Sequence, residues 1–77
     1  MLHTTVSLST VQDSIRLANN GYVFASNLSA EYCRRAQQLV DRGVLVKARV
    51  ANIFNEIEDT FFTRESAKIH AHLINLV

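Results

Sequence analysis

Apolar positions recur at helical spacing near the start of the chain. Val11 and Ile15 lie about one helical turn apart, which is typical of a helix that buries one face. The Ser-Thr-Val-Gln sequence at residues 9–12 has the form of a capping box, in which the first and last side chains each bond the other's backbone N–H. Asn-Asn-Gly at residues 19–21 tolerates the left-handed geometry of a helix end. The pattern predicts a helix over about residues 10–20.

A short strand and a second helix are expected next. Tyr-Val-Phe at residues 22–24 is a run of β-formers long enough for one short strand. Ser29 suits the N-cap of the following helix, and Gly43 is placed to end it. Four apolar residues between them share one helical face and are expected to be buried, namely Tyr32, Ala36, Leu39 and Val40.

From residue 44 the period of the apolar positions changes to two. Val46 and Ala48 alternate with Lys47 and Arg49, which predicts a half-buried strand. The β-formers in Asp-Thr-Phe-Phe-Thr predict a second strand over residues 57–63, joined to the first by a polar turn. The three nearby phenylalanines are expected in the core rather than stacked on nucleic-acid bases, namely Phe54, Phe61 and Phe62.

The C-terminal segment again has helical periodicity. Its apolar stripe consists of Ile69, Leu73, Leu76 and Val77. This stripe predicts an amphipathic helix that packs either on the first helix or on a second copy of the chain. The expected fold class is therefore α+β, with the order helix, strand, helix, β-hairpin, helix.

Composition and charge restrict the class of function. The chain has 77 residues, 48% hydrophobic and 19% charged, so we expect one globular domain over residues 1–77 with a modest core and no deep active-site cleft. The net charge is only +1, but it is unevenly distributed. Residues 1–49 carry six basic and three acidic side chains, and residues 50–77 carry two basic and four acidic ones. Such asymmetry can orient a protein on nucleic acid.

Motifs of catalysis are not found in the sequence. It has no nucleophile elbow, P-loop, dinucleotide-binding turn or paired-carboxylate motif, so we expect a non-enzyme without a cofactor. His70 and His72 would point in nearly opposite directions on a helix, which argues against a shared metal ion. The single cysteine, Cys33, is expected to be a buried apolar residue. Because the N-terminus lacks a signal-peptide pattern and no apolar run spans a membrane, a cytoplasmic setting is expected.

One segment resembles a known family. Residues 29–46, Ser-Ala-Glu-Tyr-Cys-Arg-Arg-Ala-Gln-Gln-Leu-Val-Asp-Arg-Gly-Val-Leu-Val, together with the element order, resemble the recognition helix and first wing strand of winged helix-turn-helix DNA-binding domains. In that family a serine opens the helix, a small residue and a leucine face the core, and an L-x-x-R-G-x-L ending leads into the wing. The family has a further helix before the recognition helix, where residues 24–28 leave room for about one turn.

The resemblance implies that residues 29–42 read duplex DNA. The positions implied to face the groove are Glu31, Arg34, Arg35 and Gln38, and those implied to approach phosphates are Ser29 and Arg42. Arg34 and Gln38 are one turn apart and belong to the residue types that read base edges. Lys47 and Arg49 on the next strand extend the basic cluster. The same side chains could instead form an ordinary solvated helix face.

Two classes of function follow. The first is a small DNA-binding transcriptional regulator that acts as a homodimer, with the C-terminal apolar stripe as the dimer seam. The alternative is a protein-binding inhibitor or adaptor of viral or mobile-element type. It would use either the Arg/Gln helix face or three acidic hairpin residues, Glu56, Glu58 and Asp59, on a basic partner. Acidic residues are repelled by DNA and therefore favour the alternative.

Overall fold

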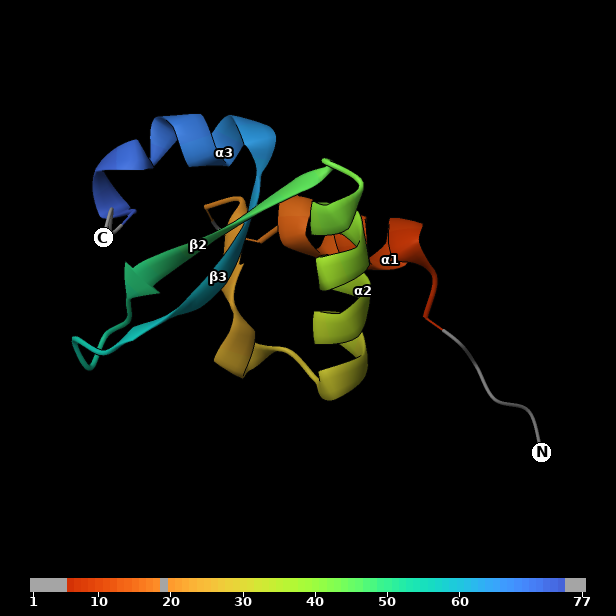
Figure 1. Ribbon diagram of the computed structural model, residues 1–77, viewed down its shortest axis with the longest axis horizontal. Coiled ribbons are helices and arrows are strands. Elements are labelled where there is room, and N and C mark those ends of the chain that lie inside the picture. Colours follow the sequence, from red (N-terminus) through yellow and green to blue (C-terminus); the bar gives the residue numbers. More distant parts are fainter. Residues whose placement is uncertain (1–5, 19, 75–77) are drawn as a thin grey trace.

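The computed structural model describes residues 6–18 and 20–74. The elements are α1 (Leu8–Arg16), β1 (Tyr22–Phe24), the 3₁₀ turn η1 (Ala25–Asn27), α2 (Ala30–Asp41), β2 (Leu45–Ala51), β3 (Ile57–Thr63), α3 (Arg64–Ile69) and the 3₁₀ turn η2 (Ala71–Leu73). This is the α+β order that the sequence predicts. Figure 1 shows α2 standing across one end of the β2–β3 hairpin, with the hairpin turn at the opposite end of the molecule.

The three strands form one antiparallel sheet in the order β1-β3-β2. In its register Val23 and Lys47 flank Phe61 on one face, whereas Tyr22 and Val46 flank Phe62 on the other, because side chains alternate along a strand. The bounds of β3 agree with the predicted strand. Since β3 is the central strand, its two phenylalanines support the two faces of the sheet.

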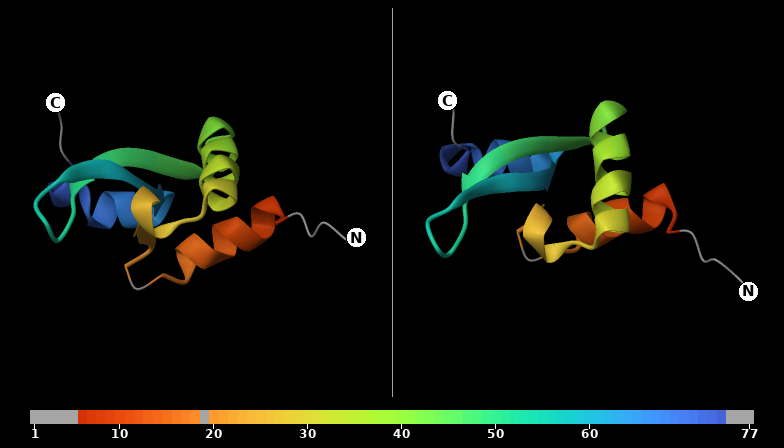
Figure 2. Two further views of the ribbon diagram at one scale, coloured as in Figure 1. Left: turned by 90° about the horizontal axis from the view of Figure 1, so that it is seen from below. Right: turned by 60° about the horizontal axis from the view of Figure 1, so that its bottom comes forward.

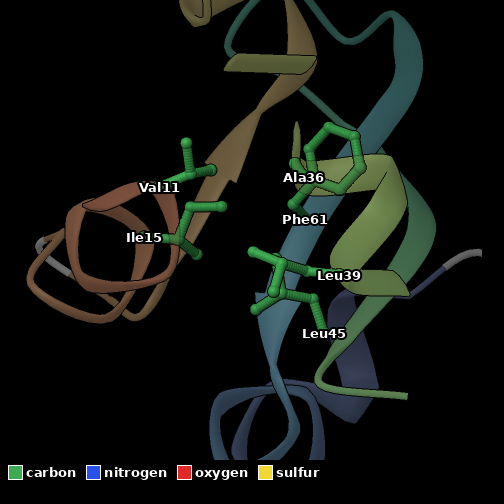
Figure 3. Packing of buried hydrophobic residues seen from close by; sticks show 6 residues of the cluster. All are labelled: Val11, Ile15, Ala36, Leu39, Leu45 and Phe61. Atoms are coloured by element: carbon green, nitrogen blue, oxygen red, sulfur yellow. The ribbon is translucent and has the colours of Figure 1, made fainter. Parts of the chain in front are cut away.

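The main core lies between one face of the sheet and helices α1 and α2. It contains Val11 and Ile15 of α1, Ala36 and Leu39 of α2, and Leu45 and Phe61 of the sheet, all at most 3% exposed. Figure 3 shows these side chains converging from the two helices and the sheet. The stripe predicted for α2 is confirmed at its centre, while Tyr32 and Val40 at its edges are half-buried and pack against the same cluster.

A smaller packed layer lies on the other face of the sheet, beneath α3. Phe62 is fully buried there, with the Tyr22 ring centroid 4.9 Å from its own and the His70 ring 5.2 Å from Tyr22. Ser66 of α3 is buried and donates a hydrogen bond of 2.6 Å to the carbonyl of Gly21. Gly21 has φ +73°, and a Cβ at this position would lie 2.8 Å from Cβ of Ser66. A glycine is therefore required by both conformation and space.

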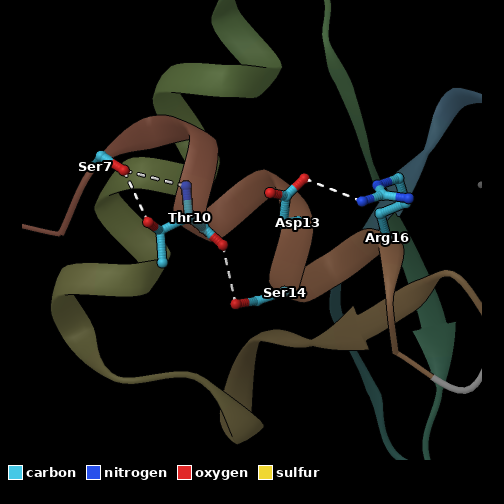
Figure 4. Close-up of polar contacts among 5 residues, drawn as sticks. All are labelled: Ser7, Thr10, Asp13, Ser14 and Arg16. Atoms are coloured by element: carbon cyan, nitrogen blue, oxygen red, sulfur yellow. Dashed lines mark hydrogen bonds and ion pairs between the residues drawn. The ribbon is translucent and has the colours of Figure 1, made fainter.

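The N-cap predicted for the first helix is wrong by two residues. Ser7, and not Ser9, has extended geometry, and its Oγ accepts a hydrogen bond of 3.2 Å from the N–H of Thr10. The earlier start places Leu8 inside the helix, where it packs against the main core. The helix ends at Arg16 rather than near residue 20. Figure 4 shows this cap together with the ion pair between Arg16 and Asp13, 3.3 Å apart.

The prediction of a long C-terminal helix is also wrong. Helix α3 ends at Ile69, and η2 and a β-bridge from Ile74 to Val50 follow it. Ile69 is 71% exposed and Leu73 36% exposed, so neither packs in the core, while Leu76 and Val77 lie outside the described residues. The chain leaves helical geometry at His70, whose ring packs on Tyr22. The contacts of His70 and Ile74 with the sheet thus end the helix, although the apolar pattern of the sequence predicts that it continues.

Candidate nucleic-acid interface

Helix α2 is capped at both ends by its own sequence. Oγ of Ser29 accepts a hydrogen bond of 3.2 Å from the N–H of Tyr32, as an N-cap serine should. At the other end Gly43 has φ +77°, its N–H bonds the carbonyl of Val40, and the N–H of Val44 bonds that of Leu39, each at 2.9 Å. This is a Schellman motif, which satisfies the last carbonyls and turns the chain directly into β2.

The outer face of α2 carries the polar residues predicted from the sequence. Arg34, Gln38 and Arg42 are exposed, whereas Glu31 and Arg35 are half-buried at its sides. Nη1 of Arg35 donates a hydrogen bond of 3.2 Å to Oε1 of Gln38. The three exposed residues are one helical turn apart in succession and therefore form one continuous line on the surface.

Strand β2 brings Lys47 against this helix. Lys47 alternates with Val46 and shares the face of Leu45, which is the face covered by α1 and α2. Its Nζ donates a hydrogen bond of 2.7 Å to Oε1 of Gln37, whose Nε2 donates in turn to Oδ1 of Asp41 at 3.0 Å. The surface of α2 is thus continuous with β2.

Gln37 belongs to this surface but is not among the predicted DNA-contacting residues. Its spacing of four residues from Asp41 is a helix-surface pairing visible in the sequence. Its bond to Lys47, ten residues away, depends on the turn at Gly43. Arg64 was likewise missed, although its Nη1 donates a hydrogen bond of 3.0 Å to the carbonyl of Gly43 at the same junction.

Arg49 lies on the same face of β2 but is directed to another partner. It faces Asp59 across the hairpin, with 4.0 Å between Nη1 and Oδ1 and both side chains about half exposed. An exposed ion pair of this length contributes little to stability, so Arg49 can exchange this partner for another anion. Of the two basic residues predicted on β2, only Lys47 contacts α2 in the hydrogen bonds of the described residues.

The hairpin turn has a different chemistry from α2. Ile53 is 89% exposed and Phe54 74% exposed, so the prediction that Phe54 belongs to the core is wrong. The two carboxylates predicted for protein contacts at Glu58 and Asp59 already have partners, and Glu56 is exposed. Both views in Figure 2 place this turn at the end of the molecule away from α2.

Glu58 is held by neutral donors. Its Oε2 accepts a hydrogen bond of 2.7 Å from Nδ2 of Asn52, and its Oε1 accepts one of 3.1 Å from the N–H of Ser26. The Asn52 amide, followed by the contacts with Ser26, lowers the pKa of the Glu58 carboxyl below its ordinary value. The carboxylate is consequently charged at neutral pH.

The part of the chain that the structure describes contains neither a cluster of metal-ligand side chains nor a membrane-spanning helix. Within residues 6–18 and 20–74, no three His, Cys, Asp or Glu side chains gather as metal ligands would. In the same part of the chain, no helix has both the length and the apolar character needed to cross a membrane. Cys33 is half-buried, and its Sγ lies 3.5 Å from the carbonyl oxygen of Ala25.

Comparison with protein-family models, curated proteins and solved structures gives no match.

Proposed function

We propose that the chain is a small DNA-binding regulator of transcription that contacts duplex DNA with the outer face of α2. The sheet order β1-β3-β2, with α2 entering β2 through a tight turn, is compatible with a winged helix-turn-helix domain. The turn η1 stands where that family has a complete second helix. This domain would therefore be an abbreviated winged helix.

The hydrogen bond between Lys47 and Gln37 is the observation that carries the proposal. It joins Lys47 of β2 to Gln37 of α2, which is next to Gln38 of the exposed line in the sequence. A single duplex can then touch Arg34 and Gln38 through its base edges while Lys47 touches a phosphate.

The remaining predicted residues take supporting roles in this proposal. Arg42 lies at the exposed C-terminal end of α2, where it would meet a phosphate. Ser29 uses its oxygen as acceptor for Tyr32, and its hydroxyl proton remains free to be donated to a phosphate. Glu31 and Arg35, at the sides of the face, would limit how deeply the helix enters the groove. Arg49 would exchange Asp59 for a phosphate.

A homodimer would give the domain a second half-site. Ile69 and Leu73 are exposed apolar residues on α3 and η2, across the sheet from α1 and α2. As the proposed dimer seam they would be buried by a second copy, and half-sites would be separated by about one helical turn of DNA. Sedimentation of an Ile69→Ser variant tests this, because a dimer that depends on the seam becomes monomeric while a monomer is unchanged.

Protein binding is the second candidate function, as an inhibitor or adaptor of viral or mobile-element type. The observation that favours it is the exposed pair Ile53 and Phe54 beside acidic Glu56. A DNA-contacting loop usually carries basic residues, whereas exposed aromatic and aliphatic side chains are typical anchors of protein interfaces.

Fluorescence anisotropy with a labelled mixed-sequence duplex separates the two functions. DNA binding through several cations weakens steeply as salt rises, because each neutralised phosphate releases counterions. We expect saturable binding at 50 mM salt and a loss of about 10-fold or more at 200 mM, as for a few phosphate contacts. Absence of binding at the lower salt concentration would rule out the DNA-binding function and leave protein binding as the better candidate.

A further inference from the structure

The turn between β2 and β3 is ordered by one asparagine. Oδ1 of Asn52 accepts hydrogen bonds from the N–H groups of Phe54 at 2.9 Å and of Glu56 at 3.0 Å. The Asn52 N–H also donates to the carbonyl of Glu56 at 2.8 Å. Asn55 takes the left-handed conformation, with φ +61°. Ile53 and Phe54 are therefore exposed on a turn whose backbone is closed by several hydrogen bonds.

A small cavity lies beside this turn. It has a volume of about 160 Å³, and its lining includes Phe24, Ser26, Asn52, Ile53, Phe54 and Glu58. Pockets for cofactors and drug-sized ligands are larger, about 300 to 1,000 Å³. This cavity is suited to one amino-acid side chain, with aromatic and aliphatic walls and a carboxylate among them.

The Glu58 carboxylate in this cavity has no positive counterpart. Among the described residues, no Lys or Arg nitrogen lies within 4.0 Å of it. The nearest basic residues of the hairpin, Lys47 and Arg49, are on the opposite face, because Glu58 pairs with Val50 and Arg49 pairs with Asp59. Each carboxylate oxygen accepts one hydrogen bond from a neutral group and retains a further lone pair.

We propose that this cavity binds the guanidinium group of an arginine side chain from a partner protein. Apolar residues that flank this arginine in the partner cover Ile53 and Phe54. A guanidinium offers parallel N–H donors that match the two oxygens of a carboxylate, and its flat face stacks on aromatic rings such as Phe24 and Phe54. An ammonium group lacks this planar fork. The site is independent of DNA binding by α2, and it assigns a ligand to the second candidate function.

The test uses a tripeptide probe and its neutral analogue. Acetyl-Leu-Arg-Leu-amide and acetyl-Leu-citrulline-Leu-amide have nearly the same shape, but only the first is charged. Each is titrated into the ¹⁵N-labelled full-length chain and followed by amide chemical shifts. We expect saturable shifts at Ser26, Asn52 and Phe54 with the arginine peptide, and about tenfold weaker binding of the citrulline peptide, equivalent to ~1.4 kcal/mol.

Matched variants locate the site. Glu58→Gln keeps the size of the side chain and an oxygen that can accept one of the two hydrogen bonds from Asn52 and Ser26, but it removes the charge, and we expect about tenfold weaker binding of the arginine peptide. Phe54→Ala removes an exposed ring without disturbing the core and should weaken binding several-fold. Glu56→Gln on the same turn removes a charge outside the cavity lining and should change binding little.

Three results would overturn the proposal. One is the absence of saturable shifts around the cavity with the arginine peptide, including shifts that appear at α2 instead. Another is equal affinity for the arginine and citrulline peptides. The third is equal weakening by Glu56→Gln and Glu58→Gln, which would indicate general attraction to an acidic hairpin. DNA binding by α2 can persist or fail in each case without affecting these outcomes.

Discussion

The two ends of the molecule expose opposite chemistry. At one end, α2 and the start of β2 present arginine, glutamine and lysine side chains that hydrogen-bond to one another. At the other end, the hairpin turn presents Ile53 and Phe54 beside a carboxylate without a cationic partner. Lys47 and Ile53 are only six positions apart in the sequence, but an extended strand advances about 3.3 Å per residue and separates them widely. Single substitutions can therefore alter the two surfaces independently.

Removal of a core side chain on which both surfaces depend should have the largest effect on stability. Phe61 is 3% exposed, lies on the central strand and packs with α1 and α2. We expect Phe61→Ala to lower the free energy of unfolding by about 3 to 5 kcal/mol, measured by chemical denaturation. Both surfaces would be lost together, because a domain of this size has little stability to spare.

Phe54→Ala is the control for this prediction. The ring of Phe54 is 74% exposed, so its removal should change the free energy of unfolding by no more than about 0.5 kcal/mol. Equal destabilisation by the two substitutions would contradict the assignment of Phe54 to an exposed interaction surface.

Two glycines separate the cost of a left-handed backbone from the cost of a steric clash. Both have positive φ, so each change to alanine should cost about 1 to 2 kcal/mol for the left-handed backbone. At Gly21 the new Cβ would also meet Ser66 at 2.8 Å, whereas at Gly43 no atom lies within 4 Å. Gly21→Ala should therefore be the more destabilising by about 1 to 3 kcal/mol in thermal or chemical unfolding. Equal losses would mean that α3 can move away without cost.

DNA binding should respond differently to helix and strand substitutions. We expect Arg34→Ala or Gln38→Ala to weaken binding to a preferred site by about 1 to 3 kcal/mol and to relax the preference there. Lys47→Ala should weaken all sequences alike and reduce the salt slope by about one. Lys68→Ala, on α3 across the sheet, is the control for loss of one charge. Similar effects of Lys68→Ala and Arg34→Ala would indicate non-specific attraction.

The smallest expected effect concerns Glu58. Its pKa is lowered in the folded chain, chiefly by the Asn52 amide, so its contribution to stability is present at neutral pH and is lost as pH falls through the folded pKa. The carboxyl ¹³C resonance should titrate below the ordinary range of a glutamate. In Asn52→Ala the midpoint should move upward, and an unchanged midpoint would exclude the Asn52 hydrogen bond as its cause.

Helix α2 and strand β3 were predictable because their signals are local. Ser29 and Gly43 mark the ends of α2, and the buried pair Ala36 and Leu39 follows from helical spacing. The bounds of β3 agree with the prediction because β-formers end abruptly at a threonine that caps the next helix. The exposed line from Arg34 to Arg42 follows from the same periodicity. Whether this line binds DNA remains a prediction.

The errors at the two ends of the fold have different causes, one local and one distant in sequence. Ser7 and Ser9 are both acceptable caps, and the earlier one is used because it places Leu8 in the helix against the core. The apolar residues after His70 continue a helical pattern, but the ring of His70 packs on Tyr22 and Ile74 pairs with Val50 instead. Tyr22 and Val50 are both far in sequence from the residues that they contact.

Local sequence patterns predicted the order of the helices and strands and the residues of α2 that face water, because periodicity and caps act within a few residues. Tertiary structure decided three further features: the contact of Lys47 with Gln37, the exposure of Phe54, and the cavity in which Glu58 lies without a cation. The contact of Lys47 with Gln37 depends on the turn at Gly43, and the other two features depend on strand register and on the turn closed by Asn52. Register follows from the packing of both sheet faces at once, and no local sequence pattern specifies that packing.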